Sequence, residues 1–251
     1  MRLFLFFIVQ MSVLLSACVS TAVDTPQSRN RAASLELARQ LVDQGEYQRA
    51  IQFLLPRSRS ADAYAEVHTL LGLSFLGINN PQAAARSFSA ALQVNDDDDD
   101  ARLNLGYTLI VLGQFKESRE TLNRIIERKK YTLMEKVYLN LGLSFLQEKN
   151  CKKAVPHFQS ALDIDPTYAA PYFNLGKCQA SAGDLAGARS SFRRAVDFCP
   201  NCLDPQLELA TVLARLGEKR NAKRAVESIL KAEPNELLKR RALALQRQLS
   251  N

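Results

Sequence analysis

The chain contains no tryptophan and only two histidines, His68 and His157, among its 251 residues. Neither histidine belongs to a pair at metal-binding spacing, and the sequence has no serine-centred nucleophile turn and no glycine-rich phosphate loop. Those patterns mark many hydrolases, metalloenzymes and nucleotide-binding enzymes, so their absence argues against an enzyme. We therefore expect no catalytic residue, no metal site and no cofactor.

Long apolar runs are also scarce, and the one that stands out is short. Leu3–Val9 is apolar throughout, and Arg2 is the only charged residue in the segment 1–15. A run of this length is typical of the core of a secretory signal peptide and is too short to span a bilayer. Residues 1–17 are therefore predicted to be a signal peptide.

The residues at the end of that segment, Leu15-Ser16-Ala17-Cys18, resemble a bacterial lipobox. In such a sequence the cysteine thiol receives a diacylglycerol, the peptide is cut before the cysteine, and the new amino group is acylated. The resemblance implies a firm lipid anchor at Cys18, because several acyl chains hold a protein to a bilayer better than one. Residue 20 is Ser and not Asp, which by resemblance to the usual sorting rule implies the periplasmic face of the outer membrane. The alternative is a plain signal peptide with an incidental cysteine.

The charge balance is basic but diffuse. Lys and Arg outnumber Asp and Glu by 33 to 26, which gives a formal net charge of +7. The basic residues are scattered and an exported chain does not meet nucleic acid, so no nucleic-acid partner is expected. The concentration of basic residues from Arg215 to Arg247 is interpreted as a solvated face of the last helices.

A Leu-Gly pair recurs along the chain with a nearly fixed period. Its glycines are Gly72, Gly106, Gly142 and Gly176, which are separated by 34, 36 and 34 residues. A period of this length indicates an array of helix-turn-helix units. Other positions keep the same period: twelve residues after each glycine lies a small residue, four residues later a bulky one, and three residues further on an alanine or isoleucine. These positions hold Ala84, Ser118, Ala154 and Ala188, then Phe88, Leu122, Phe158 and Phe192, then Ala91, Ile125, Ala161 and Ala195.

Together these residues resemble the tetratricopeptide repeat, in which two helices approach closely at small residues and large apolar side chains fill the gaps. Pro166, Pro200 and Pro234 match its helix-ending proline. The resemblance implies an all-α fold, a right-handed superhelical solenoid of about six repeats closed by a C-terminal capping helix. The repeats are expected near 31–64, 65–98, 99–134, 135–168, 169–202 and 203–236, with the capping helix at 237–250 and a flexible lipidated tether at 18–30.

Three local features stand out against the period. Pro56 lies where the second helix of the first repeat should continue, so that helix is predicted to end near Leu55.

Asp96–Asp100 is a run of aspartates, which we interpret as the turn and first residues of a helix. A calcium loop is the alternative, although the spacing of the aspartates does not fit one. The third unit is two residues longer than the others, and the insertion is placed in the basic turn Arg128–Tyr131.

Four cysteines lie in the later repeats, and export to an oxidising compartment favours disulfides. In the repeat frame, Cys151 opens the second helix of the fourth unit and Cys178 lies late in the neighbouring antiparallel helix, at an axial offset of about 6 Å. We therefore predict a Cys151–Cys178 bridge and a Cys199–Cys202 bridge across the intervening turn. The alternatives are a redox-active Cys-X-X-Cys pair or a zinc site built from all four.

The concave face of the solenoid is the expected binding surface. By resemblance to the family, the second, fifth, ninth and twelfth residues of each first helix line the groove, and in this chain many of them are apolar. Such a groove suits an amphipathic helix or apolar peptide of a protein partner. The alternative is that the curvature of the superhelix or the tether buries about half of this apolar face. The groove residues are Leu73, Leu76, Leu103, Tyr107, Ile110, Leu139, Leu143, Leu146 and Phe173.

An outer-membrane lipoprotein built from about six tetratricopeptide repeats resembles the type IV pilus pilotins. The resemblance covers nearly all of the chain after Cys18. It implies that the groove binds subunits of the pilus secretin and promotes assembly of the secretin multimer, and hence pilus-dependent gliding motility. The alternative is a lipoprotein scaffold for peptidoglycan enzymes or envelope biogenesis.

Overall fold

The computed structural model describes residues 26–60, 64–128 and 131–250. In these ranges the chain forms thirteen helices and no strand, which confirms the predicted all-α solenoid. The helices are α1 (Pro26–Asp43), α2 (Tyr47–Ser58), α3 (Ala65–Gly77), α4 (Pro81–Val94), α5 (Asp99–Val111), α6 (Phe115–Arg128), α7 (Met134–Gln147), α8 (Cys151–Ile164), α9 (Ala169–Ser181), α10 (Leu185–Phe198), α11 (Leu203–Arg215), α12 (Lys219–Lys231) and α13 (Glu236–Ser250).

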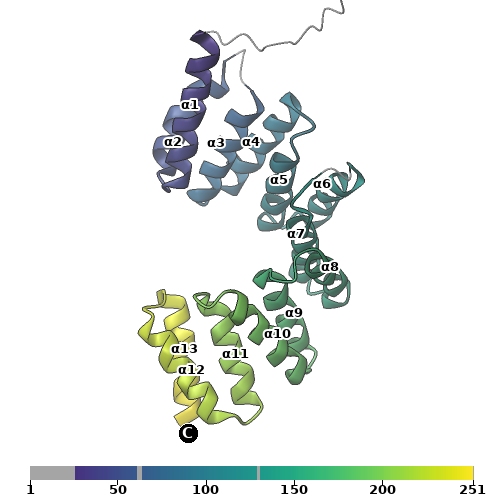
Figure 1. The fold of residues 1–251 in the computed structure, drawn as a ribbon, viewed down its shortest axis with the longest axis vertical. Helices are drawn as coiled ribbons and strands as arrows, with labels where there is room; N and C mark the ends of the chain where they lie inside the picture. Colours follow the sequence, from purple (N-terminus) through teal and green to yellow (C-terminus); the bar gives the residue numbers. More distant parts are fainter. Residues whose placement is uncertain (1–25, 61–63, 129–130, 251) are drawn as a thin grey trace, which may run out of the picture.

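The helices stack in chain order into a curved array with its two ends far apart (Figure 1). Helices α1 to α5 form the upper part, α6 to α8 make the bend, and α9 to α13 form the lower part. Each helix packs against the next one along the chain, and most first helices also contact the first helix of the following unit. The fold is therefore built from neighbouring contacts, as expected of a solenoid.

Tight turns separate the two helices of each unit. Gly113 and Gly183 have φ values of 76° and 84°, a left-handed conformation that costs glycine little. The residue after Gly183, Asp184, then caps α10 by accepting a hydrogen bond from the backbone N–H of Gly187 at 2.9 Å. Asn80 caps α4 in the same way. A left-handed residue followed by a capping side chain thus ends one helix and begins the next.

The repeated glycines let the two helices of a unit approach closely. A Cβ atom built on Gly142 would lie 2.4 Å from the ring of Phe158, and one on Gly176 would lie 2.6 Å from the ring of Phe192. Both phenylalanines are fully buried. Each ring therefore fills a niche that exists only because the facing residue has no side chain, which is the role that the sequence pattern predicts for these positions.

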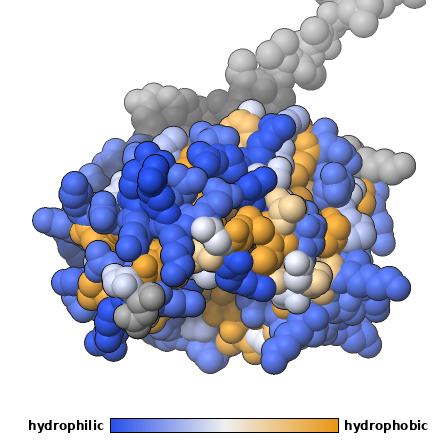
Figure 2. All heavy atoms as spheres, turned by 90° about the horizontal axis from the view of Figure 1, so that it is seen from below, coloured by the Kyte–Doolittle hydropathy of each residue, from blue (hydrophilic) through white to orange (hydrophobic). Residues whose placement is uncertain are grey.

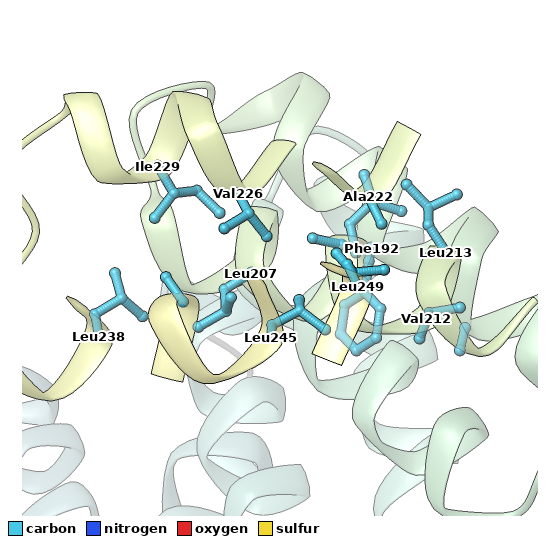
Figure 3. Close-up of a cluster of buried hydrophobic side chains, with 14 residues drawn as sticks. Phe192, Leu207, Val212, Leu213, Ala222, Val226, Ile229, Leu238, Leu245 and Leu249 are labelled. Atoms are coloured by element: carbon cyan, nitrogen blue, oxygen red, sulfur yellow. The ribbon is translucent and has the colours of Figure 1, made fainter. Parts of the chain in front are cut away.

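The core is a series of clusters along the array, and the last cluster shows how the array is closed. It joins α10, α11, α12 and α13 around Phe192, Leu207 and Val226 (Figure 3). From α13, Leu238, Leu245 and Leu249 enter this cluster and are at most 7% exposed. Helix α13 thus covers the apolar face that the last repeat would otherwise leave open.

Two boundaries differ from the prediction. Helix α1 begins at Pro26, so residues 26–30 are helical and are not part of a tether; proline suits the first turn of a helix because its missing N–H is not needed there. Helix α2 continues through Pro56 to Ser58, not ending near Leu55. Pro56 lies in the last turn, where the side chains of Arg57 and Ser58 donate to the carbonyls of Phe53 and Leu55. The predicted signal peptide and Cys18 lie outside the described residues.

Candidate functional site

The structure divides the nine predicted groove residues into buried and accessible ones. Leu103, Ile110 and Leu139 are only 8%, 7% and 9% exposed and belong to the core of the array. They are buried because adjacent units pack against that side of the first helices. These three residues are therefore not open binding surface, which corrects the prediction for them.

The other groove residues remain accessible to different degrees. Leu73 packs partly against the N-terminal core, Leu143 and Leu146 against the core of the fourth and fifth units, and Phe173 against the last core. Leu76 is half-buried, and Tyr107 is 43% exposed. We call the accessible set, together with Val111, the apolar stripe: Leu73, Leu76, Tyr107, Val111, Leu143, Leu146 and Phe173.

Val111 is a residue that the sequence reasoning missed. It is 49% exposed and lies four residues after Tyr107 on α5, so the two side chains share one helix face. Its position in the repeat falls one residue beyond the set used for the prediction, and the spacing of four from Tyr107 was the available signal. Seen from below, apolar residues gather near the middle of the molecular surface with polar residues around them (Figure 2).

Arg128 and Tyr131, which lie at the two ends of the predicted basic insertion, contact the aspartate run 96–100. Arg128 lies 2.7 Å from carboxylate oxygens of both Asp96 and Asp97. Tyr131 donates a hydrogen bond to Asp100 at 2.6 Å, and burial and this bond raise the pKa of its phenol. Sequence reasoning treated the two segments separately. Arg128 and Tyr131, the described residues at the two ends of the predicted insertion, thus contact the turn before α5 and its first residues.

Beside that turn, in the first part of α5, Arg102 has the largest fully buried side chain among the described residues. Its guanidinium donates to Asp99 at 2.9 Å and to the side chain of Asp96 at 2.7 Å. Asp98 caps α5 by accepting from the N–H of Ala101 at 2.9 Å. The aspartates are thus engaged by arginines and by a helix start, and among the described residues no group of three or more His, Cys, Asp or Glu is placed to hold a metal ion.

The structure joins the four later cysteines in two bridges, Cys151–Cys178 and Cys199–Cys202. Their Cα atoms lie 5.4 Å and 5.3 Å apart. The first bridge ties the start of α8 to α9 in the next unit, and Cys178 is 2% exposed. The second bridge closes the turn between α10 and α11.

The second bridge stands where other units use a hydrogen-bonded turn. Asn95 and Asp165 occupy the corresponding positions at the ends of α4 and α8. Their side chains accept hydrogen bonds from the backbone N–H groups of Asp97 and Thr167, at 3.1 and 2.9 Å respectively. Cys199 occupies the same place at the end of α10. The disulfide therefore does covalently what an Asx turn does elsewhere.

We expect the two bridges to differ in their contribution to stability. Their sequence separations are 27 and 3 residues. In the chain-entropy account, loops of these lengths correspond to about 3.5 and about 2 kcal/mol. Urea unfolding of Cys151→Ser/Cys178→Ala and of Cys199→Ser/Cys202→Ser would measure both losses. A larger loss for the second pair would contradict this ranking.

Among the described residues, no helix combines the length and the apolar character needed to cross a bilayer.

The array resembles tetratricopeptide-repeat proteins in both sequence and structure. A family profile described as tetratricopeptide repeat matches residues 76–130 and 145–198. PilW, a widely conserved type IV pilus biogenesis factor, has a similar structure, with a TM-score of 0.75, 18% identity, and coverage of 87% of this chain and all of PilW (100%). PilF of Pseudomonas aeruginosa gives a TM-score of 0.72 at 17% identity, with 88% of this chain and 99% of PilF covered. The fold is therefore a tetratricopeptide-repeat superhelix.

A much longer protein matches this chain in sequence over a small part of its own length. Superkiller protein 3 of Schizosaccharomyces pombe is 28% identical over 186 residues, which is 72% of this chain but only 13% of that protein. The chain thus spans only a small part of the length of this relative.

Proposed function

We propose that this protein is an outer-membrane lipoprotein of the pilotin type, which binds secretin subunits through its apolar stripe and promotes assembly of the secretin multimer for type IV pilus biogenesis. The observation that carries the proposal is the likeness to PilW and PilF, which extends over nearly their whole lengths, 100% and 99%. A likeness over single repeats would point only to a common building block. The likeness to PilW and PilF also extends over most of this chain, 87% and 88% of it.

The apolar stripe supports the same proposal. Leu73, Tyr107 and Leu143 hold the same position in successive first helices, one residue after the repeated glycine, and Leu76 and Leu146 share a second position. Exposed apolar area on a monomer commonly marks a place where a partner binds. An amphipathic segment of a secretin subunit would lay its apolar face along this stripe. A lipid on Cys18 would keep the stripe close to the membrane in which the secretin assembles.

The proposal is tested by the state of the secretin in the native bacterium. Deletion of the gene is expected to leave secretin monomers in place of heat-stable multimers, detected by immunoblotting of unboiled membranes. Complementation with Tyr107→Asp/Val111→Asp is expected to reduce multimers about tenfold or more, since charges at the centre of an apolar contact cost several kcal/mol. Both residues are about half exposed, so the array should still fold.

The matched control changes exposed apolar residues outside the stripe. Ile164 and Leu237 are 48% and 72% exposed, and Ile164→Asp/Leu237→Asp should restore multimers fully. Unchanged multimers in the deletion strain would refute the secretin role. Equal loss in the stripe variant and in the control would show that the stripe is not the contact surface.

A further inference from the structure

A second surface lies near the C-terminal end, where α10 and α12 flank α11. A cavity of about 400 Å³ opens between them. Leu209 and Leu213 of α11, only 6% and 5% exposed, form its floor, and Val196 and Ala225 form its apolar walls. Arg193 and Arg224 stand at its rim. We call this cavity the C-terminal groove.

Stacked aromatic side chains stand at equivalent positions in the two preceding units. In the fourth unit Phe145 and His157 occupy the positions of Leu213 and Ala225, and their rings stack at 5.5 Å. The pKa of His157 is lowered by burial, which fits a ring used for packing. The small side chain of Ala225 leaves the corresponding space in the sixth unit empty.

The fifth unit shows the same contrast at another position. There Tyr172 stacks with Phe198 at a centroid distance of 5.8 Å, and the guanidinium of Arg194 lies 5.9 Å from the Tyr172 ring. In the sixth unit the position of Tyr172 holds Gln206. The amide of Gln206 donates to the carbonyl oxygen of Pro200 at 2.6 Å, so this side chain is bound to the turn. The C-terminal groove therefore lacks both aromatic plugs.

The rim of the groove is cationic, and among the described residues its two arginines form no close ion pair. In the described part of the chain, neither Arg193 nor Arg224 forms an ion pair with a carboxylate, and both are exposed. Arg224 donates only to the amide oxygen of Asn221, at 2.6 Å. Asn221 and Arg189 both bind the nearby Glu218. These hydrogen bonds, together with the charges of Arg189 and Arg193, lower the pKa of the Glu218 carboxyl. That acid is therefore already engaged. Glu218 thus offsets part of the charge of Arg193, while Arg224 has no such carboxylate among the residues that the structure describes.

The chemistry of the groove specifies what would fill it. Guanidinium groups bind carboxylates through paired hydrogen bonds, and the apolar floor excludes an occupant that is charged throughout. We infer that the C-terminal groove docks an acidic segment of a partner protein, which inserts one apolar side chain over Leu209 and Leu213 while its carboxylates meet Arg193 and Arg224. This surface lies on α10 to α12, away from Tyr107 and Val111. The inference can therefore be tested independently of the secretin proposal.

The test measures binding of a fluorescein-labelled acidic helical peptide composed of Glu, Leu and Ala to the full-length protein by fluorescence anisotropy. Arg193→Glu/Arg224→Glu is expected to raise the Kd about tenfold or more, because both carboxylate contacts become repulsive. Gln206→Tyr is expected to raise the Kd similarly by restoring the plug that Tyr172 provides in the fifth unit. The melting temperature of Gln206→Tyr should be unchanged or higher, so its loss of binding would not reflect unfolding.

The control reverses the same number of charges elsewhere. Arg86 and Lys152 are exposed on α4 and α8, and Arg86→Glu/Lys152→Glu should change the Kd by less than about twofold at physiological salt. Equal weakening by this control would overturn the inference, since binding would then follow net charge. Absence of peptide binding, full binding by Gln206→Tyr, or binding of phosphatidylglycerol vesicles in place of the peptide would also overturn it.

Discussion

Phe158→Ala is expected to lower the free energy of unfolding by about 3–5 kcal/mol. Phe158 is fully buried, and its ring fills the niche opposite Gly142. Glycine has no side chain that can move into the space left by the ring. The helices α7 and α8 are also held by their remaining contacts, so the cavity would collapse only in part. Urea unfolding followed by circular dichroism at 222 nm would measure the loss.

Phe198→Ala is the matched control, because it removes the same atoms from an exposed site. Phe198 is 37% exposed and its main aromatic contact is Tyr172. We expect its loss to be about 1 kcal/mol, the size of one aromatic pair with partial burial. Hydrogen exchange of Phe158→Ala should rise first in α7 and α8, since stability in an array is shared mainly between neighbours. Losses of equal size for both variants would contradict the claim that the niche opposite Gly142 makes Phe158 especially stabilising.

The niche is also the part of the fold that the sequence predicts best. A period near 34 residues, with glycine at one position and Phe or Leu at another, requires that the same contact recur in each unit. Gly142 with Phe158 and Gly176 with Phe192 make that contact. Such contacts are within one unit and depend only on helix geometry, so they can be inferred from spacing.

The binding surface was predicted less well, for a physical reason. Whether a first-helix residue faces the groove or the next unit depends on how adjacent units rotate against one another, and this rotation has no local signature. Leu103 and Tyr107 lie one turn apart on α5, yet their exposures are 8% and 43%. The pairing of Arg128 with Asp96, which are 32 residues apart, also needed the packed array. A side-chain pair that occurs in one unit only does not recur along the sequence, so the repeat period does not reveal it.

Arg102→Ala is expected to lower the free energy of unfolding by about 3 kcal/mol. The side chain of Arg102 is 1% exposed, so its removal leaves a large void at the start of α5. It also removes the hydrogen bonds to Asp99 and Asp96. The two causes can be separated because the acids do not depend on Arg102 alone. Asp96 is 71% exposed and can be hydrated, and Asp99 keeps Arg128 at 3.6 Å.

Arg102→Met separates packing from charge, since methionine retains most of the volume and none of the charge. If the void dominates, Arg102→Met should recover at least about half of the loss, leaving about 1.5 kcal/mol. Arg124→Ala is the control: Arg124 is exposed on α6, and its change should stay within about 0.5 kcal/mol. Urea unfolding of the three variants would decide between the causes. An equal loss for Ala and Met would assign the stabilisation to the charge, and the aspartate turn would then depend on its ion pairs more than on packing.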